Sequence, residues 1–119
     1  PIPEALRPAL GNRIYGCDDC QRVCPWNKYA KVSALPDFAV REPFADPTLL
    51  DLWRWDDAEF LRRTEGSAIR RSGHERWLRN IAVALGNAPT TPAVVNALES
   101  RREHPSPVVR EHVAWALLQ

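Results

Sequence analysis

The stretch Gly16-Cys17-Asp18-Asp19-Cys20-Gln21-Arg22-Val23-Cys24-Pro25-Trp26-Asn27 holds all three cysteines of this 119-residue chain. The cysteines follow the spacing C-x2-C-x3-C, and a proline comes directly after the third. An odd number of cysteines argues against a secreted disulfide framework. Cysteines clustered in this way favour metal or redox use in a reducing compartment.

The proline makes the spacing more specific than a lone C-x2-C pair. C-x2-C-x3-C-P is the last part of the bacterial ferredoxin run C-x2-C-x2-C-x3-C-P, in which the cysteine before proline ligates the other cluster of a two-cluster pair. On this pattern Cys17 and Cys20 would serve one cluster and Cys24 the second. A [4Fe–4S] cluster normally takes four thiolates, so we expect the remaining ligands to lie outside this chain.

Zinc is the alternative metal. Three cysteines and one histidine form a known zinc site, and the histidine would have to be one of the three that lie far along the chain, His74, His104 and His112. The proline after the third cysteine has no role in zinc knuckles, which favours iron–sulfur. No histidine has a cysteine or carboxylate at ligand spacing, so we interpret all three as structural or exposed.

The composition is that of an ordinary globular protein, with 45% hydrophobic residues, 26% charged residues and a net charge of +1. No apolar run is long enough to cross a bilayer, and no secretory signal is visible. We therefore expect a cytoplasmic monomer without membrane contact. The chain begins Pro1-Ile2-Pro3 and contains no methionine. Together with the incomplete cysteine set, this predicts the C-terminal piece of a longer protein.

The charge is unevenly distributed. Residues 1–60 contain seven basic and ten acidic side chains, whereas residues 61–119 contain nine basic and five acidic ones. A basic half that is rich in arginine points to a polyanionic partner.

Prolines and capping residues predict short helices in the first half. A helix over residues 3–10 would end at Gly11. Residues 31–47 contain three prolines and are interpreted as irregular connection. Asp46-Pro47 predicts the start of a helix that ends near residue 53, and Asp56 caps another that ends near residue 66.

The second half shows clearer helical periodicity. Apolar residues at 77, 78, 81, 82, 84 and 85 predict an amphipathic helix that closes at Gly86-Asn87. Thr91-Pro92 opens the next helix, which we expect to end at His104-Pro105, and Ser106-Pro107 opens the last. Residues 81–85 (Ile-Ala-Val-Ala-Leu) repeat as residues 113–117 (Val-Ala-Trp-Ala-Leu), which is typical of a helical solenoid.

The expected fold is therefore mostly α, with an irregular ferredoxin-like cluster loop followed by a short HEAT-like helical-repeat domain. We place the boundary between residues 1–45 and residues 46–119. Four tryptophans are assigned to the core: Trp53, Trp55, Trp77 and Trp115. Trp26 and Tyr29 are expected to cover the cluster or to pack in the core.

The cysteine stretch and its flanks resemble a known family. Residues 11–21 (Gly-Asn-Arg-Ile-Tyr-Gly-Cys-Asp-Asp-Cys-Gln) and 23–27 (Val-Cys-Pro-Trp-Asn) look like the second cluster motif of epoxyqueuosine reductases. Residues 79–87 (Arg-Asn-Ile-Ala-Val-Ala-Leu-Gly-Asn) resemble the HEAT-like repeats that follow this motif in the family. The resemblance is strong over 11–27 and looser over 67–119.

This resemblance implies an oxidoreductase that converts epoxyqueuosine to queuosine in tRNA. It implies two [4Fe–4S] clusters, a cobalamin in an N-terminal domain absent from this chain, and an electron donor protein. Cys17 and Cys20 would belong to the cluster farther from cobalamin, and Cys24 to the nearer one. The catalytic acid would lie in the missing domain, so no catalytic residue is expected here and the chain alone should be inactive.

On the same resemblance, the arginines would bind tRNA phosphates around the anticodon. Arg70 and Arg71 are the first choices, and the remaining candidates are Arg62, Arg63, Arg76 and Arg79. For any single arginine, a solvated helix face is the preferred interpretation, and only the group as a whole favours tRNA. Two other functional interpretations stay open: a non-catalytic HEAT-type module that binds nucleic acid or protein and has a zinc-stabilised front, and a simple ferredoxin-like electron carrier.

Overall fold

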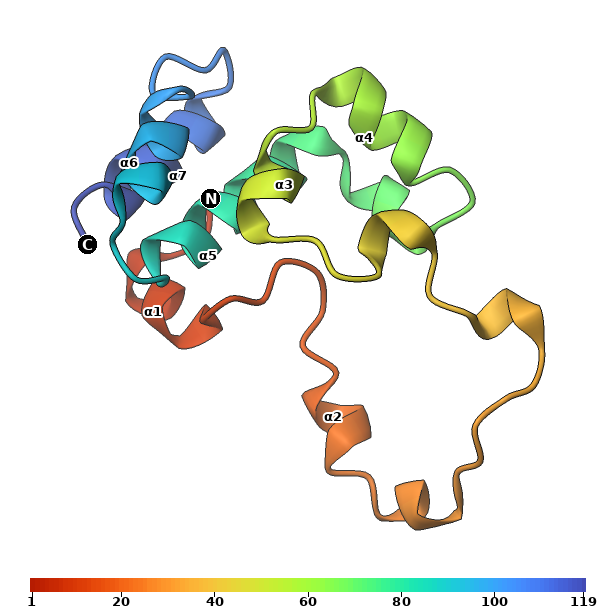
Figure 1. Ribbon diagram of the computed structural model, residues 1–119. Helices are drawn as coiled ribbons and strands as arrows, with labels where there is room; N and C mark the ends of the chain where they lie inside the picture. The colour runs from red at the N-terminus through yellow and green to blue at the C-terminus, as the bar shows by residue number, and fades with distance from the viewer.

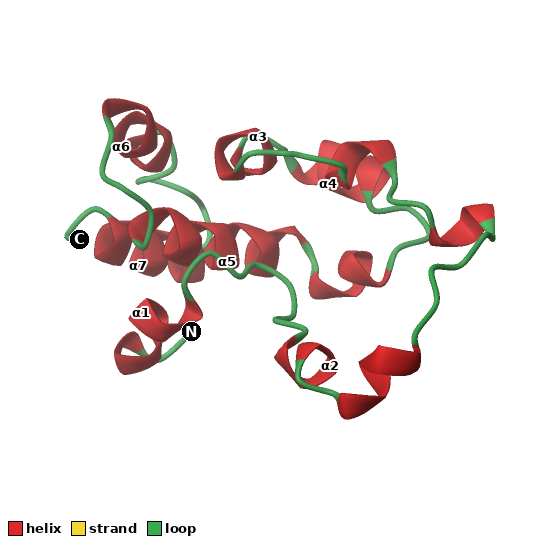
Figure 2. Cartoon of the chain, turned by 60° about the horizontal axis from the view of Figure 1, so that its bottom comes forward, coloured by secondary structure: helices red, strands yellow, loops and turns green.

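The computed structural model describes residues 1–119 and contains helices but no strands, as the sequence predicts (Figures 1 and 2). The α-helices are α1 (Arg7–Leu10), α2 (Asp19–Arg22), α3 (Leu49–Trp53), α4 (Asp57–Arg63), α5 (His74–Gly86), α6 (Pro92–Glu99) and α7 (Pro107–Ala116). The 3-10 helices are η1 (Glu4–Leu6), η2 (Pro25–Tyr29), η3 (Pro36–Phe38), η4 (Glu42–Phe44) and η5 (Ala68–Ser72). None of these helices combines the length and the apolar character that a membrane span requires.

Helix α5 is the centre of the helical body, with α3, α4, α6, α7 and α1 around it (Figure 1). Its residues from Ile81 to Leu85 are all buried, including the face that meets α7. The repeated segments 81–85 and 113–117 thus lie mainly in two helices that pack against each other. Assignment of this body to the HEAT class stays a prediction.

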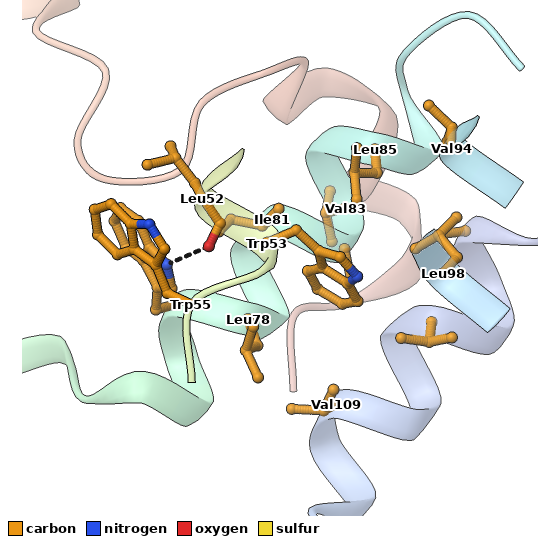
Figure 3. Close-up of a cluster of buried hydrophobic side chains, with 14 of the residues drawn as sticks. Leu52, Trp53, Trp55, Leu78, Ile81, Val83, Leu85, Val94, Leu98 and Val109 are labelled. Carbon is orange, nitrogen blue, oxygen red and sulfur yellow. Dashed lines mark hydrogen bonds between the residues drawn. The ribbon is translucent and has the colours of Figure 1, made fainter. Parts of the chain in front are cut away.

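The core contains the four tryptophans that the sequence assigns to it, each with less than a tenth of its surface exposed. Trp55 stacks on Trp77 with ring centroids 5.5 Å apart. Two of the four indole N–H groups have backbone acceptors: Trp77 donates to Leu52 O at 3.4 Å (Figure 3), and Trp53 donates to Ala97 O at 2.8 Å. Burial of a large apolar side chain stabilises a fold by about 1.5–3 kcal/mol, so these residues join α3, α5 and α6.

The predicted helix starts are confirmed at three places. Asp56, Thr91 and Ser106 each accept a hydrogen bond from the backbone N–H three residues later. The prediction at Asp46 was wrong, because α3 begins after Thr48. There the Thr48 side chain accepts from Asp51 N–H and Asp51 accepts from Thr48 N–H, which forms a reciprocal capping box.

The helices predicted after Asp56 and Thr91 are shorter than expected. Helix α4 ends at Arg63 and is followed by turns up to Gly66. Helix α6 ends at Glu99, where the chain continues in turns to His104. The expected helix over residues 3–10 forms as η1 and α1, and Gly11 closes it with φ +57°.

Residues 1–14 pack on the helical body and form an N-terminal strap. Ile2 N–H donates to His112 Nε2 at 3.1 Å. Arg7 is buried, forms an ion pair with Glu111 of α7 and lies over the Trp115 ring. A buried guanidinium needs such a partner, so the strap is attached by polar contacts as well as by apolar ones.

Residues 15–42 behave differently and form an arm that extends away from the helical body (Figures 1 and 2). None of its residues is buried, and Cys24 alone is half-buried. Trp26 and Tyr29 contact each other but are 73% and 64% exposed. The expectation that one of them packs in the core of this chain was therefore wrong.

Candidate metal centre

The cysteine stretch folds into two short helical turns joined at Cys24. Gly16 and Asp18 both have positive φ, at +64° and +54°. This conformation is rare for residues with a Cβ, and it brings Cys17 into the loop before α2. Cys20 lies within α2, and Cys24 precedes η2, whose first residue is Pro25. Proline suits the first position of a helix, because the N–H that it lacks would have no partner within the helix.

Asn27 joins the two turns. Its Nδ2 donates to Gln21 O and lies 3.5 Å from Arg22 O, at the C-terminal end of α2. The Cys24 carbonyl accepts from Asn27 N–H at 3.1 Å. The last residue of the C-x2-C-x3-C-P-W-N stretch therefore closes the loop that carries Cys20 and Cys24. The sequence analysis gave Asn27 no role.

All three cysteines are free thiols, with Cys17 and Cys20 exposed and Cys24 half-buried. No three histidine, cysteine, aspartate or glutamate side chains converge as ligands of one ion. The donor set is thus three thiols on one accessible loop. Thiolates are the usual ligands of iron–sulfur clusters, so the residues fit such a cluster as part of a ligand set that other residues must complete.

The three histidines are engaged away from the cysteines. His74 Nε2 lies 2.8 Å from Trp55 O, and His104 Nδ1 accepts from Ser106 N–H at 3.1 Å. His112 is buried between the strap and Val108 O. These contacts support the interpretation that the three histidines are structural. Each contact would have to break before the imidazole ring could approach the cysteine loop.

The six candidate arginines divide into two groups. Arg62 and Arg63 both bind the Glu59 carboxylate, which lowers the pKa of Glu59. Arg79 is half-buried and donates to Asn80 Oδ1.

Arg70, Arg71 and Arg76 form the second group, which we call the open arginine cluster. They are exposed, and no carboxylate forms an ion pair with them. They lie in η5 and in the first turn of α5. Burial, and then the neighbouring charge of Arg76, lowers the pKa of Arg79. The charge of Glu75 opposes this shift without reversing it, and the positive charge of the cluster has no ion-pair partner.

Comparison with known proteins agrees with the cysteine pattern. Residues 1–27 match the family described as 4Fe-4S double cluster binding domain. The chain is 64% identical over 99% of its length to an epoxyqueuosine reductase of Xanthomonas campestris pv. campestris. It is 60% and 59% identical, again over 99%, to those of Salmonella typhimurium and Escherichia coli.

This chain is similar to part of the epoxyqueuosine reductases. The resemblance predicted from residues 11–27 is confirmed and extends over nearly the whole chain. The chain covers 33%, 30% and 31% of the three relatives, so it spans about a third of their length. No solved structure matches the chain.

Sequence reasoning missed the residues that attach the cysteine loop to the helical body. Asn80 and Asn87 donate to backbone carbonyls of the strap, and Arg41 donates to the loop after α4. One signal was present: two asparagines seven residues apart lie on one face of a helix. Their acceptors are 66 to 80 residues away in the chain, and no local pattern identifies them.

Proposed function

We propose that this chain is the C-terminal part of an enzyme that reduces epoxyqueuosine to queuosine in tRNA. The observation that carries this proposal is the 59–64% identity to epoxyqueuosine reductases over 99% of the chain, cysteine loop included. The chain would supply cluster ligands and a surface for tRNA. The reaction itself would take place on a cobalamin held by a domain outside this chain.

Cys17, Cys20 and Cys24 are the proposed cluster ligands. Three thiols cannot complete two four-thiolate sites, so cysteines outside this chain must provide the others. When bound, such clusters carry single electrons between a donor and an acceptor. This chain's own contribution is to hold the thiols on one loop and to attach that loop to a rigid helical body.

The zinc alternative is less well supported, because the three histidines already have other partners. Analysis of iron, sulfide and zinc in the anaerobically purified full-length protein tests the proposal. We expect iron and sulfide together with the visible absorption of an iron–sulfur cluster. Stoichiometric zinc without that absorption would favour the zinc-stabilised binding module. Iron–sulfur absorption without reduction of epoxyqueuosine would favour the simple electron carrier.

The open arginine cluster is the best candidate for the tRNA surface. Guanidinium groups without carboxylate partners are free to bind phosphates, and each phosphate contact adds a salt-dependent contribution to affinity. Arg62 and Arg63 are weaker candidates because Glu59 already neutralises part of their charge.

Replacement of Arg70 and Arg71 by alanine tests this assignment in the full-length enzyme. We expect tRNA affinity to fall and the slope of log K against log salt to decrease by about 1 for each lost contact. Arg102→Ala is the matched control, because Arg102 is exposed but paired with Glu99. Equal affinities for wild type and double variant at several salt concentrations would reject the assignment.

A further inference from the structure

The arm that carries the cysteines is attached to the helical body at its two ends. Before the arm, Asn80 Nδ2 of α5 donates to Ile14 O at 2.7 Å. At its other end, the Arg41 guanidinium donates to Glu65 O at 2.5 Å and to Gly66 O at 3.4 Å. Nothing between these points is buried. The two anchors, together with the exposed ion pair of Arg13 with Asp19 of α2 at 3.1 Å, therefore set where the thiols lie.

The Asn80 side chain is held in one orientation. Its Oδ1 accepts from Arg79 Nε at 3.0 Å and from Arg79 Nη2 at 2.8 Å. A guanidinium can only donate, so the amide must turn its oxygen toward Arg79 and its Nδ2 toward Ile14. Both residues are half-buried, which strengthens such bonds relative to exposed ones.

Asn87 attaches an earlier part of the strap to the helical body. It lies directly after the last residue of α5, about 10 Å further along the helix axis than Asn80. Its Nδ2 donates to Arg7 O at 2.8 Å and to Gly11 O at 3.0 Å, which are carbonyls at the first residue of α1 and directly after its last. The strap is therefore held along α5, and Asn80 provides the last contact before the cysteines.

Cys17 lies close to this last contact. It follows Ile14 by three residues, and it lines a surface groove of about 400 Å³ together with Ile14, Gly16, Arg79 and Asn80. The apolar side of the groove comes from Ile2, Leu6 and Leu10 of the strap. A shift of the Ile14 carbonyl would therefore move the first thiol relative to the body.

We propose that Asn80, oriented by Arg79, is a positioning residue for the iron–sulfur ligands and holds Cys17 in place for its cluster. This inference rests on the proposed function for the presence of the cluster. On this proposal the helical body holds the cysteine loop directly, in addition to any contact that it makes with tRNA.

Asn80→Asp in the full-length protein tests the inference. Aspartate has nearly the same shape and keeps the acceptor for Arg79, but it presents an oxygen instead of a donor to the Ile14 carbonyl. We expect iron release to a chelator, measured anaerobically, to be about three- to tenfold faster than in wild type, as the loss of one hydrogen bond implies. The midpoint potential and electron paramagnetic resonance signal of the cluster should also change.

Asn96→Asp is the matched control, because Asn96 is exposed on α6 and its side chain makes no hydrogen bond. The melting temperatures of both variants should stay close to that of wild type, which separates positioning from unfolding. Hydrogen exchange of the amides from Tyr15 to Cys17 gives a cluster-independent readout and should accelerate only in Asn80→Asp.

The two proposals fail in different ways. A wild-type protein without an iron–sulfur cluster would overturn the proposed function and this inference with it. A cluster whose iron release, potential and spectrum are the same in wild type and Asn80→Asp would overturn only the inference. Equal changes in Asn80→Asp and Asn96→Asp would also overturn it, because the effect would not come from the Ile14 contact.

Discussion

His112 shows how one buried side chain holds the N-terminal strap. Its Nε2 accepts from Ile2 N–H, and Nδ1 lies 2.7 Å from Val108 O, so the proton is on Nδ1 and the ring is neutral. Burial is the main cause that lowers the pKa of His112, and the charge of Arg7 acts in the same direction. The Val108 hydrogen bond and Glu111 oppose this shift without reversing it.

We predict that the protein loses stability as the pH falls below about 6.5, the value for an unperturbed histidine. The folded-state pKa lies lower, so in this range the unfolded chain takes up a proton that the folded chain excludes. The melting temperature should decrease by roughly 4–8 °C for each 1 kcal/mol lost. Calorimetry between about pH 7 and pH 5 measures this slope.

His112→Gln isolates this contribution. Glutamine does not titrate and can still accept from Ile2 N–H. The melting temperature of the variant should therefore depend less steeply on pH than that of wild type. Burial also lowers the pKa of His104, and that effect is present in both proteins. If the melting temperatures of wild type and variant change in parallel with pH, protonation of His112 does not cause the loss of stability.

At the scale of elements, the contact of α5 with α7 depends on the absence of a side chain at Gly86. A Cβ there would lie 2.7 Å from Trp115 Cζ3 and 2.9 Å from both Cα and Cβ of Ala116. Such distances require the helices to separate, because backbone atoms are involved. Small residues at this crossing thus set how closely the two repeated segments pack.

We predict that Gly86→Ala destabilises the protein, although alanine is the better helix former. Overpacking of a core contact costs about 1–3 kcal/mol, whereas the gain in helix propensity is about 1 kcal/mol. Urea denaturation should show a net loss of stability. Asn96→Ala, at an exposed position of α6, is the control and should change stability by less than about 0.5 kcal/mol. A more stable Gly86→Ala protein would contradict the close packing.

The helix starts could be predicted where one residue decides them. Thr91 and Ser106 are each followed by proline, and a cap acts on an N–H only three residues away. At α3 the cap is Thr48, two residues after the predicted Asp46, because Asp51 can return the hydrogen bond. Asp46 was predicted because proline follows it, and that pattern does not include the reciprocal bond between Thr48 and Asp51.

The candidate site was predictable to a similar extent. The three cysteines proposed as cluster ligands are close in sequence, so their spacing alone is enough to propose them. The anchors Asn80 and Arg41 bind backbone carbonyls that are 66 and 24 residues away in the chain. The exposure of Trp26 depends on which other segments pack beside the arm. No local pattern carries such information, because these contacts are decided by how the chain folds back on itself.

At the scale of the whole molecule, the helical body buries its apolar residues, whereas the arm exposes them. Tyr15 of the arm is 47% exposed, and its other large apolar side chains are between 62% and 100% exposed: Val23, Trp26, Tyr29, Val32, Leu35, Phe38 and Val40. Exposed apolar surface of this extent marks an interaction site. The chain spans about a third of its relatives' length, and the proposed clusters need more thiolates than the three on this arm. We therefore predict that the arm packs against parts of the full-length protein that lie outside this chain.

We predict that Trp26→Ser combined with Phe38→Ser destabilises the full-length protein and lowers its iron content. If the arm packs on the rest of the full-length protein, each of these exposed aromatics would become buried there and contribute about 1.5–3 kcal/mol, so loss of both should lower the melting temperature by several degrees. Leu118→Ser is the control, since Leu118 is 83% exposed but lies just after α7, away from the arm. Calorimetry with iron analysis compares the three proteins. If the double variant matches Leu118→Ser in both measurements, the arm does not pack on the rest of the polypeptide.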